Sequence, residues 1–309
     1  DQKKGGDAKA DDVETLLARF PCLRVAYLEV VKDRRAAPNG AEEETEVTTR
    51  YSSVLVRKSG GAVEELSRVA LPGNPILGEG KPENQNLGMA FTTGECVTMV
   101  DMNQDGYFEE ALKMRNLLEE FRAADPSPGG ERPVTIVGFP EHVFTQSSGF
   151  VTAIYAAMQE RFFGTWWQRV QVKLDIRAHY GHPDVLDKLH FMTRGGCSKA
   201  SKEINLSEDV FAGYKTMLRG GRVVHVEYHQ LGKGRMTNLS EVNGFFAKLS
   251  QGAACQLMSR DLYRLNRALP PDRALSLFFS GFGFYICTAA RVLTMQVTGC
   301  HCHSPSAPP

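Results

Sequence analysis

The sequence predicts an α/β protein in which short strands and amphipathic helices build a mixed sheet with flanking helices. Three observations support this fold class. Apolar and polar residues alternate over 23–31, 48–56 and, more weakly, 63–71, which is the two-residue period of strands. Residues 107–122 instead place apolar side chains at helical spacing with charged residues between them. Residues 133–138 then form a short apolar run that is typical of a buried strand.

The composition limits what the chain can bind. Its 309 residues, 42% of them hydrophobic, can bury one large core or two modest ones. Lys and Arg together number 36, as do Asp and Glu, so net charge does not direct the chain to nucleic acid. Any bound anion must therefore be held by a local cluster. The seven scattered cysteines favour reduced thiols over a disulfide framework.

Two polar stretches near the start, residues 1–10 and 33–46, are rich in charge, Gly, Pro and Ala, and we expect them to be flexible. The three alternating segments suggest an antiparallel patch. The chain begins without a methionine and without a signal peptide, which suggests a piece of something longer.

The stretch from residue 73 to residue 105 is the one around which the chain is organised. Lys81 lies in a segment punctuated by Gly and Pro, which predicts a binding loop, and three side-chain amides follow it: Asn84, Gln85 and Asn86. Residues 97–100 have strand composition, and Asp101 falls where that strand would end. Ligands of open α/β sheets bind beyond the carboxyl ends of strands, so we expect Asp101 to face a crevice.

Two familiar motifs are excluded in this stretch. The run from Asp101 to Gly106 begins like a calcium loop, but Leu112 occupies the twelfth position, where a carboxylate is needed. The run ending at Lys81 is not a Walker P-loop, because Pro75 replaces its first glycine and Pro82 its Ser or Thr.

The middle of the chain is less regular. Residues 150–167 are aromatic and apolar, and we interpret them as a core helix rather than a membrane-surface helix. Residues 173–205 are predicted to be rich in loops. Their histidines, His179, His182 and His190, lack metal-site spacing. Arg194 precedes two glycines, so its guanidinium and the backbone could approach an anion together.

The next elements lead to a second basic segment. Ser207 is a predicted N-cap, which places Glu208 and Asp209 in a first helical turn, where the helix dipole favours acids. Residues 223–226 form a predicted strand that leads into Gly-Lys-Gly-Arg, a mobile loop carrying Lys233 and Arg235. Helices are expected over 239–250 and 257–267.

The final apolar segment has two interpretations. Residues 275–290 are uncharged, but Arg291 interrupts them short of the roughly 20 residues that a membrane span needs. The segment either enters a bilayer with Arg291 snorkelling or forms a buried or interfacial helix. The Cys-His-Cys-His run from Cys300 is attributed to chance, because no second ligand pair accompanies it.

Several long motifs in one order resemble the 1,3-β-glucan synthase (callose synthase) family over residues 50–295. They are Gly73-Asn-Pro-Ile-Leu-Gly-Glu-Gly-Lys-Pro-Glu-Asn-Gln-Asn, Asp101-Met-Asn-Gln-Asp, His179-Tyr-Gly-His-Pro-Asp-Val, Thr193-Arg-Gly-Gly-Cys-Ser-Lys-Ala, Ser207-Glu-Asp-Val-Phe-Ala-Gly, Gly232-Lys-Gly-Arg and Leu257-Met-Ser-Arg-Asp-Leu-Tyr-Arg-Leu. The resemblance implies a GT-A-like nucleotide-sugar transferase domain on the cytosolic face of the plasma membrane. That domain would use UDP-glucose to extend a linear β-1,3-glucan with inversion at the anomeric carbon.

The resemblance also implies roles for individual residues. An inverting transferase needs cations near the leaving diphosphate and a carboxylate base for the acceptor hydroxyl. Asp101 would act on the donor. The donor and its diphosphate would be bound by Lys81, Asn84, Asn86, Arg194, Lys233 and Arg235. By analogy with other processive β-glycan synthases, Glu208 and Asp209 would supply the base, and Gln256 and Arg260 would line the acceptor side.

We expect four parts in the chain: a polar, partly flexible N-terminal segment with one strand (1–46), an incomplete glycosyltransferase catalytic region (47–268), an apolar interfacial or transmembrane helix (269–299) and a disordered tail (300–309). The implied partners are UDP-glucose, the β-1,3-glucan chain, the membrane through the rest of the polypeptide, and a regulatory GTPase subunit. No metal site or cofactor is firmly predicted. Asp101 with Asn103 could place Mg²⁺, but protein cations are expected to neutralise most of the diphosphate charge.

Three departures from the family pattern leave a second interpretation open. Leu87 stands where the family has His, Met236 where an acid follows Gly-Lys-Gly-Arg, and Ala253-Ala-Cys255 where a stretch with Gly and Glu is usual. The chain could therefore be a catalytically inactive nucleotide-sugar-binding or assembly module. The family's membrane segments and the opening of its catalytic domain are missing, so this stretch alone is not expected to make polymer.

Overall fold

The structure is a computed structural model that describes residues 8–36, 45–78, 81–122, 132–144, 150, 154, 184–201, 207–234, 238–280 and 282–302. The chain forms two compact units. Unit 1 comprises Asp1–Gly94 with Ala200–Lys202, and unit 2 comprises Glu95–Lys199 with Glu203–Pro309. The predicted boundary at residue 46 falls inside unit 1, within a strand that runs from Thr45 to Ser59.

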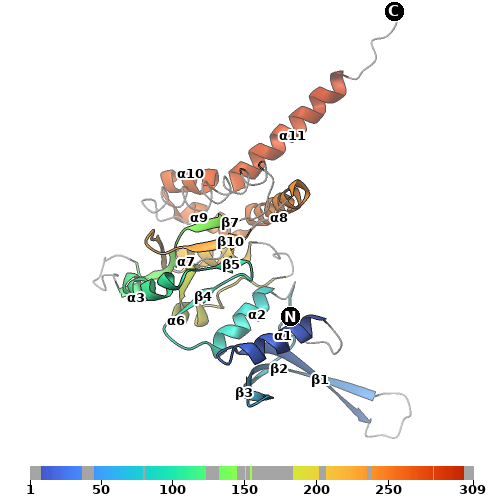
Figure 1. Ribbon diagram of the computed structural model, residues 1–309. Coiled ribbons are helices and arrows are strands. Elements are labelled where there is room, and N and C mark those ends of the chain that lie inside the picture. Colours follow the sequence, from blue (N-terminus) through green and yellow to red (C-terminus); the bar gives the residue numbers. More distant parts are fainter. Residues whose placement is uncertain are drawn as a thin grey trace, which may run out of the picture. The chain divides into compact units, whose positions relative to one another are not determined.

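Unit 1 is built on an antiparallel sheet in the order β1-β2-β3, as the alternating pattern predicted. Its strands are β1 (Val25–Ala36), β2 (Thr45–Ser59) and β3 (Ala62–Leu71), preceded by the helix α1 (Ala8–Arg19) (Figure 1). The prediction of flexibility was wrong for 8–10, which begin α1, and for 33–36 and 45–46, which lie in β1 and β2. Ladder pairing reaches Ala36 and Thr45, so hydrogen bonding orders these charged ends.

The turn between β2 and β3 consists of two glycines, whose backbone conformation it requires. Gly60 and Gly61 link Ser59 to its partner Ala62, and their φ angles are 59° and 90°. A two-residue hairpin turn with both central φ angles positive matches the right-handed twist of the strands, and glycine adopts it without a steric penalty.

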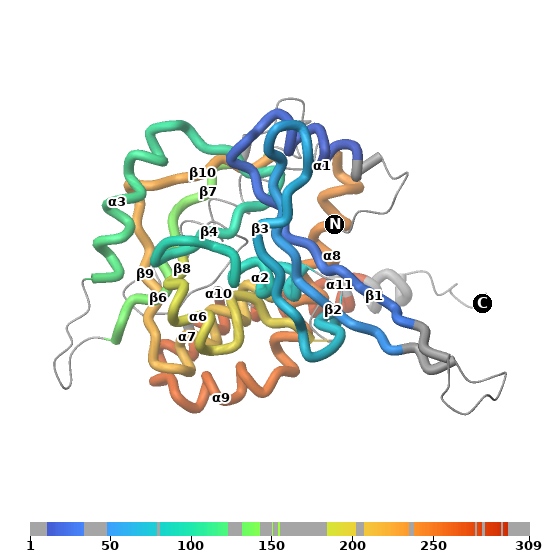
Figure 2. The backbone as a smooth tube through the Cα atoms, turned by 90° about the horizontal axis from the view of Figure 1, so that it is seen from below, coloured from blue at the N-terminus to red at the C-terminus, as the bar shows by residue number. Residues whose placement is uncertain are grey.

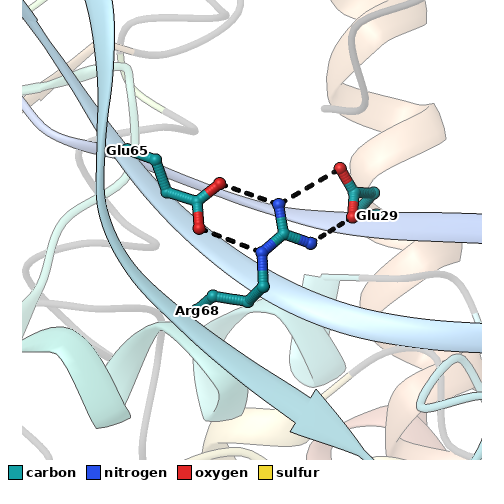
Figure 3. Close-up of polar contacts among 3 residues, drawn as sticks. All are labelled: Glu29, Glu65 and Arg68. Atoms are coloured by element: carbon teal, nitrogen blue, oxygen red, sulfur yellow. Dashed lines mark hydrogen bonds and ion pairs between the residues drawn. The ribbon is translucent and has the colours of Figure 1, made fainter.

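An exposed ion-pair group ties the two outer strands together (Figure 3). The guanidinium of Arg68 on β3 contacts the carboxylate of Glu65, at 2.7 Å between Nη2 and Oε2, and reaches over β2 to the carboxylate of Glu29 on β1. The Arg68 hydrogen bond is the main reason that the pKa of Glu65 lies below its ordinary value. Because these groups face water, the pairs help to set the register more than they stabilise the sheet.

The predicted binding loop around Lys81 is instead largely helical, which corrects the sequence interpretation. The helix α2 (Lys81–Gly88) contains Lys81, Asn84 and Asn86, and the 3₁₀ turn η1 (Met89–Phe91) follows it. Pro82 in the first turn removes no intrahelical hydrogen bond. The buried Glu83 carboxylate accepts hydrogen bonds from the amides of Leu77 (2.8 Å) and Gly78 (2.7 Å), which fixes the preceding segment.

Unit 2 contains two small mixed sheets whose strands are interleaved along the sequence. The first has the order β4-β8-β6-β9 and the second the order β5-β10-β7 (Figure 1). Their strands are β4 (Cys96–Met99), β5 (Gln104–Asp105), β6 (Val134–Gly138), β7 (Glu141–Phe144), β8 (Asp184–Asp187), β9 (Arg222–His225) and β10 (Leu231–Gly234). β6 runs parallel to β9, and β7 runs parallel to β10, while the other pairs are antiparallel. The structure is thus the mixed α/β architecture that the sequence predicted.

One strand of the first sheet was missed. β8 and the helix α6 (Lys188–Met192) lie in the stretch that was predicted to be rich in loops. β8 pairs with both β4 and β6, so its conformation is set by neighbours on both sides rather than by its own short sequence. Of the other middle residues, only positions 150 and 154 of the predicted 150–167 helix are described, and both are helical. His179 and His182 lie outside the described residues.

Helices surround these sheets, and their positions confirm most of the helical predictions. Figure 2 shows α3 (Phe108–Arg122) alongside β6, where Leu117 is fully buried. The other helices are α7 (Glu208–Leu218), α8 (Leu239–Leu257), α9 (Arg260–Ala268), α10 (Pro271–Ser280) and α11 (Phe282–Cys302). Phe211 and Tyr214 of α7, with residues of α8 to α11, form one apolar core.

The apolar C-terminal segment is two helices rather than the single predicted one. Among the described residues, no one helix is long and apolar enough to cross a membrane, but Pro271–Phe279 and Phe282–Met295 together meet that test as a pair bent by 53°. At the bend Gly283 approaches the carbonyl of Phe278 so closely that an added Cβ would lie 2.6 Å from its oxygen. The predicted tail beyond residue 302 lies outside the described residues.

Candidate functional site

Unit 2 brings together an acid and a lysine that the sequence had singled out. Asp101 follows β4, and Lys233 lies on β10. The Lys233 Nζ atom is 3.3 Å from Oδ2 of Asp101 and 3.3 Å from Oε1 of Glu141, which begins β7. Lys233 and Glu141 are buried, whereas 29% of the Asp101 side chain is exposed. Asp101 therefore presents the part of this cluster that a ligand can reach.

Strand pairing holds the cluster together. Lys233 lies opposite Gln104 in the β5–β10 pair, and the Gln104 Oε1 atom accepts a hydrogen bond from the Asp101 amide at 2.7 Å. The Gln104 side-chain nitrogen donates to Glu141. Asn103 and Gly234 exchange two further bonds, 2.9 Å from the Asn103 amide side chain and 2.8 Å from the Gly234 backbone amide. The Asp-Met-Asn-Gln-Asp and Gly-Lys-Gly motifs are thus joined by hydrogen bonds.

This geometry corrects the expectation that Lys233 lies on a mobile loop. Its ammonium is buried in a strand and shared by two carboxylates, so the three charges sum to minus one. A buried charge needs partners, since removing it from water unpaired costs several kcal/mol. The cluster is suited to accept hydrogen bonds from hydroxyl groups at Asp101 rather than to bind an anion.

A second buried acid supports the strand that carries Lys233. Glu110 on α3 accepts a hydrogen bond from the Gln230 amide at 3.0 Å and from the Lys113 ammonium at 2.8 Å, and it lies 3.1 Å from Nδ1 of His229. Burial opposes ionisation of Glu110, but these partners outweigh it and hold its pKa below the ordinary value. Burial lowers the pKa of His229, against the opposing effect of Glu110.

Sequence reasoning missed Glu110, Glu141 and Gln104. For Glu110 a signal existed, because it shares a helical face with Met114 and Leu117, and an acid within an apolar stripe needs an explanation. Glu141 and Gln104 gave no such local signal. The contacts of Glu141 with Gln104 and Lys233 join strands that are distant in sequence.

The predicted acceptor-side residues lie on α7, α8 and α9. Glu208 begins α7 and is buried, while Ser207 before it has a φ of 75° and makes no side-chain cap, so its predicted capping bond is absent. Buried Gln256 accepts a hydrogen bond from the Tyr214 hydroxyl at 3.1 Å. Arg260 begins α9 and is exposed. Asp209 is half-buried, and its carboxylate accepts a 2.8 Å bond from the Val210 amide.

The remaining predicted residues fall in separate places. Lys81 and Asn84 are exposed and Asn86 is half-buried on α2, in unit 1, so their meeting with Asp101 remains a prediction. Arg194 is exposed in the turn after α6. Arg235 lies outside the described residues.

No metal cluster marks the site in the described part of the chain. No group of three or more His, Cys, Asp and Glu side chains there has a geometry that could hold a metal ion. Two surface pockets lie along α1 and the β2–β3 turn of unit 1, and no predicted site residue lines them. The site is therefore defined by its polar contacts.

The fold and the site define a mixed α/β protein with a polar cluster at the ends of adjacent strands. Comparison with known sequences goes further: the family model for the 1,3-beta-glucan synthase component matches residues 2–302. The chain belongs to the 1,3-β-glucan synthase family, which confirms the resemblance that its motifs indicated.

Individual relatives are close in sequence but much longer. The chain is 48% identical over 297 residues to Callose synthase 9 of Arabidopsis thaliana, which covers 96% of the chain and 15% of that protein. It is 46% identical over 308 residues to Callose synthase 4 of the same plant, covering 96% and 16%, and 47% identical over 295 residues to Callose synthase 5, covering 95% and 15%. The chain thus spans 15–16% of the length of these relatives.

Proposed function

We propose that the chain is part of the GT-A-like catalytic region of a processive, inverting glucosyltransferase that adds glucose from UDP-glucose to a β-1,3-glucan. The observation that supports this most directly is the Lys233–Asp101 ion pair, because it assembles two of the family's motifs into one polar cluster. Membership of the 1,3-β-glucan synthase family supports the substrate class.

In this proposal Asp101 is the donor-side acid. Its carboxylate is partly exposed and lies beside the Lys233 ammonium, so it can accept hydrogen bonds from the donor's hydroxyl groups. The buried Glu141 completes the pairing of Lys233 and holds the ammonium in place. Lys81, Asn84 and Asn86 on α2 remain proposed as donor-binding residues.

The acceptor side is assigned to the helices. Conversion of an α-linked donor into a β-linked product needs one in-line displacement, in which a carboxylate removes the proton of the attacking hydroxyl. Glu208 or Asp209 would be this base. Both lie in the first turn of α7, where the helix dipole favours a charged carboxylate. Gln256 and Arg260 would orient the acceptor.

A divalent ion has no role in the proposed steps. A metal at Asp101 and Asn103 would compete with the Lys233 ammonium 3.3 Å from Asp101, while the Asn103 amide is bound to the Gly234 carbonyl. The residues present therefore do not fit a metal held between these two side chains.

The test is a product-linkage assay on membranes that carry the complete polypeptide. UDP-glucose should yield β-1,3-glucan, and Lys81→Ala or Asp101→Asn should abolish it with expression intact. The departures at Leu87 and Met236 favour a second candidate, an inactive nucleotide-sugar-binding or assembly module. Retained UDP binding without turnover in the unmodified protein would establish that module instead. The plasma membrane, with the catalytic region facing the cytosol, and a regulatory GTPase partner belong to this proposal.

A further inference from the structure

One aromatic and two basic side chains follow one face of α7 and its C-cap. Phe211, Lys215 and Arg219 follow one another at intervals of four residues, which places them on the same face of a helix. Successive members lie about 6 Å apart along the axis. Phe211 is fully buried, Lys215 is half-buried, and Arg219 is exposed at the helix end.

The turn after α6 runs beside this face and adds two more cations. At one end of the row, the Lys199 ammonium lies 4.6 Å from the centre of the Phe211 ring, and its backbone amide donates to the Glu208 carbonyl at 3.4 Å. At the other end, the Arg219 guanidinium donates to the Arg194 carbonyl. Gly195 and Gly196, both with a φ of 89°, allow the backbone to turn here.

Of the four cations in this basic row, Arg194, Lys199, Lys215 and Arg219, only Lys199 forms an ion pair with a carboxylate within the described residues. Asp261 of α9 forms an ion pair with Lys199. Asp187, near the Arg194 end, accepts a hydrogen bond from the His190 amide. Within the described part of the chain, Lys215 makes no hydrogen bond and no ion pair. Burial first, and then the charges of Lys199 and Arg219, lower the pKa of Lys215, against the opposing effects of the Asp261 carboxylate and of Cys197.

This contrasts with the Lys233 cluster. There, one ammonium is shared by two carboxylates, which leaves a net negative charge. Unit 2 thus contains two different electrostatic environments: an acidic one around Asp101 and a basic one along α7 and the 194–199 turn. A leaving diphosphate requires the basic one, because developing negative charge is stabilised by cations that are already oriented.

We propose that the basic row on α7 and the 194–199 turn is a binding site for a phosphate-bearing anion, with Lys215 and Arg219 as its central ligands. The existence of this anion site does not depend on the proposed function. Only the identity of the anion rests on it: under the proposed function, the anion is the diphosphate of the nucleotide donor. Lys233 then serves to position Asp101, and the diphosphate is bound along α7. A phospholipid headgroup presents the same chemistry and is the other source.

The test uses the full-length protein in phosphatidylcholine nanodiscs, with inorganic pyrophosphate as the calorimetric probe. Loss of one charge-assisted hydrogen bond weakens binding by about tenfold or more, which is the effect expected for Lys215→Gln and for Arg219→Gln. Arg219→Lys should retain most of the affinity. The matched control is Lys248→Gln, on an exposed position of α8, which should leave affinity unchanged. Equal affinities in the two site variants and the control would overturn the proposal.

Two further measurements identify the source of the anion. If UDP affinity falls with pyrophosphate affinity, the site binds the donor's diphosphate. If UDP affinity is unchanged and phosphatidylinositol phosphate in the nanodiscs displaces pyrophosphate from the unmodified protein, the site binds a lipid headgroup. A protein that makes no β-1,3-glucan would refute the proposed function but leave the pyrophosphate result interpretable.

Discussion

Lys233 and Asp101 come from different motifs, yet the ammonium of one lies 3.3 Å from the carboxylate of the other. The pair is held by strands, because β10 lies between β5 and β7 and each neighbour contributes a polar side chain to the cluster. The position of the candidate catalytic acid therefore depends on strand pairing rather than on a flexible loop.

Removing the lysine should destabilise the protein. Lys233→Met leaves buried Glu141 without its ammonium, and we expect the free energy of unfolding to fall by about 3–5 kcal/mol. Adding Glu141→Gln removes the unpaired charge, so the double variant should recover part of this stability while remaining inactive. Thermal unfolding of the detergent-solubilised full-length protein measures both effects, and Lys248→Met on an exposed face of α8 is the control. A double variant no more stable than Lys233→Met would contradict the ion pair with Glu141.

The sequence pattern was sufficient to predict the elements that bury only one face. The alternation in β1, β2 and β3 and the helical spacing in α3 predicted those elements, because burial on one face leaves a periodic trace. Asp101 was placed correctly after a strand, because residues 97–100 have the composition of one. In α2, however, the Gly and Pro residues predicted a loop, since the contacts of Glu83 that fix its start cannot be read from local spacing.

The site was only partly predictable, because its contacts join strands that are distant in sequence. Family motifs identified Lys233 but not its burial, which depends on β5 and β7 pairing on either side of β10. An acid such as Glu141, next to Pro140, looks in sequence like a surface residue. Its role emerges only when the chain brings Lys233 beside it.

Gly221 should tolerate no side chain. It connects α7 to β9, and an added Cβ would lie 2.6 Å from Oγ1 of Thr135 and 2.8 Å from Cγ2 of Thr216. Overpacking of this kind lowers the free energy of unfolding by about 1–3 kcal/mol, which is the loss expected for Gly221→Ala. Gly244→Ala is the matched control. Gly244 lies within α8 with nothing within 4 Å of the new Cβ, so that substitution should stabilise by about 0.5–1 kcal/mol. Equal unfolding midpoints for the two variants would refute the predicted clash.

Acid should destabilise the region around α3 in two stages. Burial lowers the pKa of His229 from its ordinary value of 6.5, so the unfolded chain binds a proton more readily, and stability falls as the pH drops below 6.5. The lowered pKa of Glu110 adds stability that is present above its ordinary value of 4.5 and is lost as the pH falls below it. His229→Gln should therefore flatten the pH dependence of the unfolding midpoint just below 6.5. An unaltered slope in His229→Gln would show that His229 does not titrate with unfolding.

Gln256 offers a way to separate packing from catalysis. Its side-chain oxygen accepts the hydrogen bond of the buried Tyr214 hydroxyl at 3.1 Å, so Gln256→Leu leaves that hydroxyl unsatisfied and should lower the free energy of unfolding by about 1–3 kcal/mol. Adding Tyr214→Phe removes the hydroxyl that Gln256→Leu leaves without an acceptor, so the double variant should regain most of the stability. If Gln256 also orients the acceptor, as proposed, the double variant will still make little glucan from UDP-glucose at full expression. Normal glucan synthesis by a stable double variant would limit Gln256 to holding α7 against α8.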